Sequence, residues 1–254
     1  MTRKPIRLTS LSPRGTAVKD DVVAVEAPVV LAVNGTPVVS LFCTPEDLQA
    51  LAVGFLYAVG ILRNRDDVAE AEIEVMPAAV SVKMNRPWIP GKDLVGIGSG
   101  CGGNLIIGPT GLVAPLPAEG GEIEAEGILS LNKDFQARAV LYRETGGTHC
   151  AAVCRPEGIL FFAEDTGRHN AADKVIGHAL LAGTSLEDKA LFLSGRIAYD
   201  IAMKAARARI PLCVSRSAPT SAALAFGERI GLTIIGFVRG RRMNIYTHPE
   251  RVIL

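Results

Sequence analysis

The second half of the chain alternates between strand-like and helix-like segments, and this alternation restricts the fold more than any other sequence feature. Short apolar runs are followed by longer segments whose apolar residues recur at helical spacing. The pattern is typical of an α/β layer in which helices cover a parallel or mixed sheet. The expected strands are 149–154, 158–163, 190–193, 212–215 and 232–238, and the expected helices are 128–142, 170–181, 198–208 and 221–230.

The first half predicts a smaller α+β unit. Asn34-Gly35 is typical of a hairpin turn, and residues 44–47 predict the start of a helix with Thr44 as N-cap and Gly60 at its end. Residues up to about 20 are expected to form a polar tail or a weakly held edge segment. The expected strands of this half are 22–25, 29–33, 38–42, 73–76 and 80–84.

A stretch rich in Glu, Gly and Pro at 115–127 is the expected linker between the two halves. We therefore predict two domains. Residues 1–126 form an N-terminal α+β domain that carries a mobile cysteine loop, and residues 127–254 form an α/β domain with a mixed sheet.

The composition excludes several classes of protein. A net charge of +1 gives no global field for nucleic acid or an anionic membrane, and the most apolar stretch, 54–62, is too short to span a bilayer. The N-terminus lacks the apolar run of a signal peptide. Five cysteines are an odd number without disulfide-framework spacing, so we expect a soluble protein in the reducing cytoplasm.

One of these cysteines, Cys101, stands in a loop made almost entirely of glycine, at 98–103. No bulky neighbour is available within the loop to pack around the thiol, so we expect it to be presented to partners. The alternative is a glycine loop with an incidental cysteine. The loop contains no lysine or arginine, so any group that activates the thiol lies elsewhere.

Four expected strands of the second half end in basic or hydroxyl-bearing residues: Arg168 and His169, Ser194 and Arg196, Arg216 and Ser217, and Arg239 to Arg242. In open α/β sheets, ligands bind at the carboxyl ends of strands, where helix N-termini and arginine forks favour phosphate. The sequence therefore predicts a phosphate-bearing ligand at this edge. None of these segments matches a Walker loop or a dinucleotide-binding glycine pattern.

A metal site is the less favoured interpretation of the His149, Cys150 and Cys154 run. Alternate residues of a strand face opposite sides, so Cys150 and Cys154 share a face from which His149 points away. The zinc-deaminase pattern of His-x-Glu with Pro-Cys-x-x-Cys is absent from the sequence. We therefore expect no bound metal.

The second half also contains a series of longer motifs. They are TGGTH at 145–149, EDTGRHNAADKVIG at 164–177, SGR at 194–196, KAAR at 204–207, Pro211, SRSAPTS at 215–221 and GFVRGRRMNIYT at 236–247. With these motifs, the chain resembles the FdhD family, the formate dehydrogenase accessory sulfurtransferases, from about residue 20 to the C-terminus.

The resemblance implies a cytoplasmic sulfur carrier and a C-terminal domain with a cytidine-deaminase-like α/β fold but no zinc. Such a carrier accepts sulfur as a persulfide from a cysteine desulfurase. It passes the sulfur to the bis-molybdopterin guanine dinucleotide molybdenum cofactor before the cofactor is inserted into formate dehydrogenase, the client enzyme. The resemblance also implies a homodimer, and no nucleic-acid or membrane partner.

Carried over residue by residue, the family's sulfur-carrying cysteine falls on Cys101. Its cofactor-binding segment falls on Phe237, Val238, Arg239, Gly240, Arg241 and Arg242. Many members of the family have a Cys-x-x-Cys pair in the loop, whereas this chain has Asn104 at the second position. A mechanism that needs a pair of loop cysteines is therefore in doubt, although a persulfide carrier needs only one thiol.

Two further hypotheses stay open. In the first, the chain is a cofactor-binding chaperone in which Cys101 is dispensable. In the second, it is a zinc-dependent or nucleotide-processing enzyme of the deaminase-like fold, against which the missing ligand motif already argues.

Overall fold

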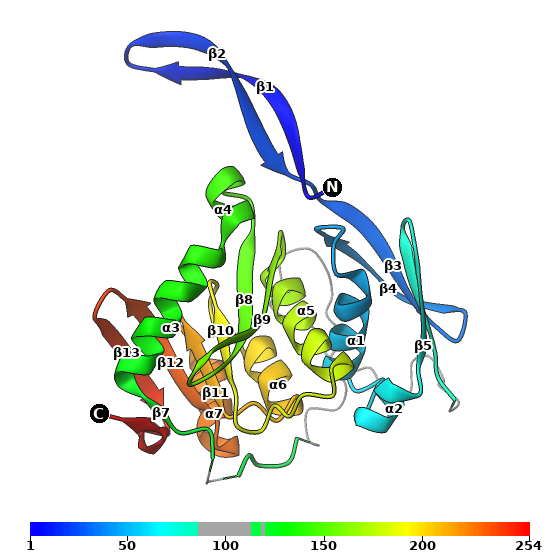
Figure 1. Cartoon of the computed structure of the whole chain (residues 1–254), viewed down its shortest axis with the longest axis vertical. Coiled ribbons are helices and arrows are strands. Elements are labelled where there is room, and N and C mark those ends of the chain that lie inside the picture. Colours follow the sequence, from blue (N-terminus) through cyan, green and yellow to red (C-terminus); the bar gives the residue numbers. More distant parts are fainter. Residues whose placement is uncertain (86–112, 118–119) are drawn as a thin grey trace.

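A six-stranded mixed sheet forms the centre of the protein (Figure 1). The computed structural model describes residues 1–85, 113–117 and 120–254. The strands of this sheet lie in the order β13-β12-β11-β10-β8-β9. Their bounds are β8 (His149–Arg155), β9 (Gly158–Asp165), β10 (Ala190–Leu193), β11 (Leu212–Ser215), β12 (Thr233–Arg239) and β13 (Arg242–Thr247).

The directions of the strands bring the functional segments to one edge. Strands β10, β11 and β12 are parallel, whereas β8 is antiparallel to both β10 and β9. Consequently, β9 runs in the same direction as β10 to β12, and the carboxyl ends of these four strands meet the amino end of β8. We call this side of the sheet the carboxyl edge. The predicted mixed sheet is confirmed, and the cytidine-deaminase likeness stays a prediction.

Helices cover both faces of the sheet because its strands carry apolar side chains on both faces. On β8, Cys150, Ala152 and Cys154 pack with α3, whereas Ala151 and Val153 belong to the larger cluster with α5, α6 and α7. No helix in the described part of the chain is both long and apolar enough to cross a bilayer. The helices are α3 (Ala125–Arg138), α4 (Val140–Thr145), α5 (Arg168–Leu181), α6 (Tyr199–Arg207) and α7 (Ser221–Ile230).

The N-terminal part adds a second sheet in the order β4-β3-β6-β5, together with α1 and α2. The predicted turn at Asn34 and Gly35 is confirmed, since both residues have positive φ between β3 and β4. Strands β7 and β14 form a small separate pair. The bounds are β3 (Ala27–Val33), β4 (Thr36–Cys43), α1 (Leu48–Ala58), α2 (Arg65–Ala69), β5 (Glu72–Met76), β6 (Ala79–Lys83), β7 (Ile123–Glu124) and β14 (Val252–Ile253).

Residues 3–24 form a hairpin, so the predicted N-terminal tail is wrong. Strands β1 (Arg3–Ser12) and β2 (Gly15–Ala24) pair only with each other and project from the rest of the protein (Figure 1). Most of their side chains are exposed. The sequence signal was weak because neither strand buries a continuous apolar face.

The predicted start of α1 is also wrong. The helix begins at Leu48, and its N-cap is Asp47 in a left-handed conformation without a side-chain cap. Thr44 is buried and makes tertiary hydrogen bonds instead. Its N–H donates to Asp165 Oδ2 at 3.1 Å, and its hydroxyl accepts from the Thr166 N–H at 3.3 Å. Tertiary contacts thus override a local capping pattern.

Two buried ion pairs fix α5 to its surroundings. Lys174 Nζ lies 2.7 Å from Asp165 Oδ2, and both side chains are completely buried. Lys174 also donates to the Thr44 carbonyl at 3.0 Å, so the pair joins the N-terminal part to the sheet. The next pair, Asp173 with Lys204 at 2.6 Å, joins α5 to α6.

Helices α1 and α5 pack closely through two glycines. A Cβ on Gly54 would overlap the carbonyl oxygen of Asp173, and a Cβ on Gly177 would overlap that of Ala50. One apolar core therefore takes in residues of both helices, Leu51 and Val175 among them. The division into domains at residue 126 stays a prediction, and the structure shows a shared core between the two parts.

We expect Gly54→Ala to lower the free energy of unfolding measured by urea denaturation. Alanine gains about 1 kcal/mol of helix propensity over glycine. The overlap with Asp173 forces the helices apart, and such overpacking costs about 1–3 kcal/mol or more.

The matched control is Gly127→Ala in α3, where a Cβ would meet its nearest neighbour at an ordinary 3.8 Å. This variant should be neutral or more stable than wild type. If Gly54→Ala is stabilised as much as Gly127→Ala, the close packing of α1 on α5 is wrong.

Candidate functional site: a basic cavity at the carboxyl edge

A cavity of about 680 Å³ opens at the carboxyl edge. Side chains at the ends of separate strands line it: His149 and Cys150 at the start of β8, Thr166 after β9, Ser194 after β10 and Arg216 after β11. The end of α3 and the start of α4 form the opposite wall. We name this space the edge cavity. Of the strand-end residues predicted to converge at this edge, Ser194 and Arg216 line the cavity, and Ser217 does not.

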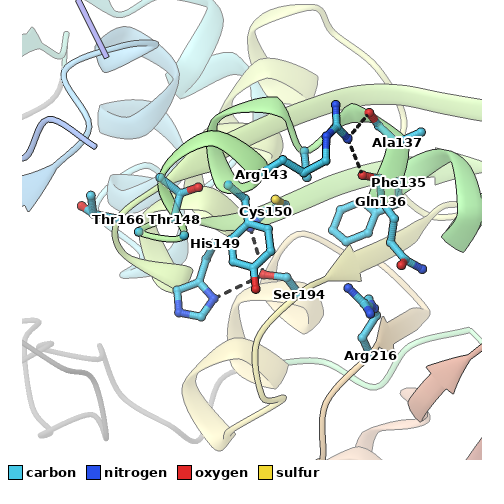
Figure 2. Close-up of a pocket in the computed structure, with 14 residues that line it drawn as sticks. Phe135, Gln136, Ala137, Arg143, Thr148, His149, Cys150, Thr166, Ser194 and Arg216 are labelled. Carbon is cyan, nitrogen blue, oxygen red and sulfur yellow. Dashed lines mark hydrogen bonds between the residues drawn. The ribbon is translucent and has the colours of Figure 1, made fainter. Parts of the chain in front are cut away.

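Ser194 and His149 form a hydrogen-bonded pair in this cavity. Ser194 Oγ accepts from the Cys150 N–H at 2.9 Å and lies 3.3 Å from His149 Nδ1 (Figure 2). The pKa of His149 lies below its ordinary value because the ring is buried and, secondarily, because Arg168 is close. The ring is then neutral and carries a single N–H donor, on Nδ1 or on Nε2.

Arg216 places a guanidinium group at the cavity, and one of its N–H groups has no hydrogen-bond acceptor in the described part of the chain. Its Nε is buried and has no hydrogen-bond partner among the residues that the structure describes. Figure 2 shows Ser194 between Arg216 and His149. A buried guanidinium N–H without a partner is unfavourable, and an anion in the cavity would satisfy it.

Glu164 holds the opposite wall in place. Its carboxylate accepts from the N–H groups of Leu141 and Tyr142, both at 2.8 Å, at the start of α4. It also accepts from the Thr148 hydroxyl at 3.2 Å. The expected single helix 128–142 is wrong, because the chain breaks at Ala139 and begins α4 on this carboxylate.

The segment assigned to cofactor binding, residues 237–242, lies next to this cavity but does not line it. Arg239 and Arg242 face each other across a tight turn at Gly240 and Arg241 between β12 and β13, and all four residues are exposed. Arg239 Nε donates to the Arg216 carbonyl at 3.0 Å. Of the remaining two, Val238 is buried and Phe237 is half-buried. The arginine turn therefore extends the basic surface beyond Arg216.

The other basic strand ends differ in their roles. Arg168 packs beneath Gly195, where a Cβ would come within 3.2 Å of its side chain. His169 Nε2 lies 3.3 Å from Asp200 Oδ2, and burial followed by the charge of Lys204 lowers its pKa to about 4. Arg196 is exposed. None of the three lines the edge cavity.

Four of the five cysteines are buried as free thiols: Cys43, Cys150, Cys154 and Cys213. Burial raises the pKa of Cys43 to about 11 and those of Cys154 and Cys213 to about 12. The pKa of Cys150 is raised as well, by burial and then by Glu164. These four thiols are therefore protonated and poor nucleophiles at neutral pH. Cys101 lies outside the described residues.

The metal interpretation gains no support from the geometry. Cys150 and Cys154 pack in the same apolar cluster, whereas His149 points to Ser194. In residues 1–85, 113–117 and 120–254, no three His, Cys, Asp or Glu side chains gather as candidate ligands.

Sequence reasoning missed the supporting residues of the site. Glu164, Asp165 and Lys174 stand in a quoted motif, but nothing in their spacing assigns them a partner. The partners of Asp165 and Lys174 include Thr44, about 120 residues earlier along the chain. Buried charged residues inside apolar segments were the one available signal.

Comparison with known proteins agrees with this architecture. The model of the FdhD/NarQ family matches residues 24–253. A Bacillus subtilis protein named sulfur carrier protein FdhD is 36% identical over 238 residues, covering 92% of this chain and 91% of the relative. A Listeria monocytogenes protein of the same name is 37% identical over 239 residues, covering 91% of each chain.

A solved structure shares the whole fold. The crystal structure of a formate dehydrogenase accessory protein from Desulfotalea psychrophila superimposes with a TM-score of 0.84 at 28% identity, covering 100% of both chains. The family model spans most of the sequence, and the relatives exceed 30% identity over most of their length. The chain therefore belongs to the FdhD/NarQ family.

Proposed function

We propose that this protein is a sulfur carrier that uses Cys101 as a persulfide. The thiolate of Cys101 attacks the terminal sulfur of a persulfide on a cysteine desulfurase. One S–S bond forms on Cys101 as the donor's S–S bond breaks, and the donor cysteine leaves as a thiolate. The observation that supports this choice is the burial of the other four thiols, whose pKa values are all raised.

The acceptor in this proposal is the bis-molybdopterin guanine dinucleotide molybdenum cofactor, bound as substrate at the carboxyl edge. The residues there fit its diphosphate groups. Arg216 has an unsatisfied buried N–H, His149 offers a neutral ring, and Arg239 and Arg241 stand on the adjacent turn. Sulfur delivered here precedes insertion of the cofactor into formate dehydrogenase. The names of the relatives support this role.

A chaperone role without sulfur transfer is the second candidate. Among the described residues, those that form the edge cavity and the arginine turn all lie within 135–242, which is compatible with a binding function that does not use Cys101. The homodimer implied by the family resemblance stays a prediction under either function.

We expect wild-type protein to gain about 32 Da, one sulfur atom, on incubation with a cysteine desulfurase and cysteine, because a thiolate attacks a persulfide sulfur. Intact mass spectrometry measures the gain, and a reductant should remove it. The matched variants are Cys101→Ala, which should gain nothing, and Cys154→Ala, which should gain as wild type does. A gain by Cys101→Ala that maps to Cys150, Cys154 or Cys213 would contradict the assignment.

Formate dehydrogenase activity in cells distinguishes the carrier function from the chaperone function. If Cys101→Ala binds the cofactor and restores formate dehydrogenase activity to wild-type level in cells that lack their own accessory protein, the chaperone function is correct and sulfur transfer by Cys101 is not.

We expect Arg216→Ala and Arg241→Ala to weaken the binding of GDP, a fragment of the cofactor, by about 10- to 100-fold each, as for a lost charge-assisted contact. Arg216→Lys should not restore affinity, because lysine lacks the planar fork. Isothermal titration calorimetry measures the affinities. Arg155→Ala, an exposed arginine at the other end of β8, is the control and should bind as wild type does. Equal affinity in all five proteins would remove the support for the phosphate site.

A further inference from the structure

A second cavity, of about 590 Å³, lies at the opposite edge of the central sheet. It opens where α1 and α6 end, and therefore at the amino ends of the parallel strands. Three arginines line it from separate segments: Arg63 after α1, Arg207 in the last turn of α6, and Arg209 in the turn before β11. We name it the amino-edge cavity. It shares no lining residue with the edge cavity.

The charged side chains that line this cavity are all basic among the described residues. None of the described residues that line it is acidic. Arg209 Nε lies 3.8 Å from Oε1 of Glu187, a residue that lines the adjoining hollow and not this cavity. Arg209 uses Nη1 to bind the carbonyls of Ala114 and Pro115, so its guanidinium is fixed in place. The walls thus hold an excess of positive charge.

Arg207 has a buried donor that the protein leaves unused. Its Nε is buried and has no hydrogen-bond partner within the described part of the chain. Burial also lowers the pKa of Arg207, as expected when a cation loses water without gaining a counter-charge. A protein interior rarely leaves such a group unsatisfied unless a ligand completes it.

The Arg207 guanidinium packs directly against the backbone of Gly60. The φ of Gly60 is +79°, and a Cβ at this position would overlap Arg207 Nη1. A residue with a side chain would therefore displace the guanidinium from the cavity wall. The rest of the lining is apolar or aromatic and includes Tyr57, Val59 and Leu62.

We propose that the amino-edge cavity binds a small organic phosphate, with its phosphate on Arg207 and its apolar or planar part against the half-buried ring of Tyr57. Arginine forks match phosphate oxygens, and a dianionic group satisfies more than one guanidinium at once, which a monoanionic carboxylate does less well. The volume leaves room for more than a phosphate ion. The site is independent of the sulfur-transfer proposal, because it lies at the other edge of the sheet.

The competing explanation is purely structural. Arginines in the last turn of a helix stabilise its C-terminal dipole, and Arg207 occupies that position in α6. Arg229 likewise lies in the last turn of α7 but is exposed and lies over the Phe226 ring. The two arginines therefore form a matched pair that separates helix stabilisation from ligand binding.

The test is a calorimetric titration of the full-length protein with phenyl phosphate, which carries both a phosphate and a flat apolar group. Wild type and Arg229→Ala should bind with equal affinity. Arg207→Lys, which keeps the charge and the helix position, should bind at least about 10-fold more weakly, because it loses the fork. Benzoate should bind wild type about 10-fold more weakly than phenyl phosphate.

GDP titration keeps this result separate from the cofactor site, since Arg207→Lys should bind GDP as wild type does. Three outcomes overturn the proposal: no saturable binding of phenyl phosphate to wild type, equal binding to wild type and Arg207→Lys, or equal affinity for benzoate. If GDP affinity falls as much as phenyl phosphate affinity in Arg207→Lys, the effect of the substitution is not confined to the amino-edge cavity and the proposal is also wrong.

Discussion

The buried ion pair between Asp165 and Lys174 is the interaction on which the arrangement of the site depends. Asp165 ends β9, and its carboxylate also accepts from the N–H groups of Thr44 and Gly167. One residue thus fixes the end of a strand, the start of α5 and the chain that leads into α1. A buried pair of this kind adds little net stability compared with apolar packing, but removal of one partner costs about 3–5 kcal/mol because a charge is left uncompensated. Its role here is to fix the position of the carboxyl edge.

The positive charge of the site depends on how this edge is held in place. Arg216 lines the edge cavity and the turn at Arg239 to Arg242 is exposed beside it, while acidic residues nearby are engaged elsewhere: Glu164 accepts hydrogen bonds from the start of α4, and Asp165 pairs with Lys174. The same segregation appears at the opposite edge around Arg207. Because carboxylates serve the internal structure and guanidinium groups are left at the cavities, a chain with a net charge of only +1 presents two basic hollows.

The sequence predicted the second half of the fold well, because its strands are short apolar runs and each is followed by a segment with apolar residues at helical spacing. The bounds of β10, β11 and α7 agree with the expected ranges to the residue. The start of α1 was wrong because Thr44 forms tertiary hydrogen bonds with Asp165 and Thr166, which no local pattern reveals. The convergence of strand ends was predictable from topology, whereas the amino-edge cavity was not. It depends on Arg63 and Arg207, which are far apart in the sequence.

A sulfur-tracing experiment tests the central claim, that sulfur passes through Cys101 to the cofactor. The protein is loaded with radioactive sulfur by a desulfurase, freed of the donor, and mixed with the cofactor and the client enzyme in the presence of excess unlabelled cysteine. The account predicts that the label leaves Cys101 and is recovered with active formate dehydrogenase in proportion to the activity gained. Full activation while the label stays on the carrier, or equal activation by the unloaded Cys101→Ala protein, would contradict it.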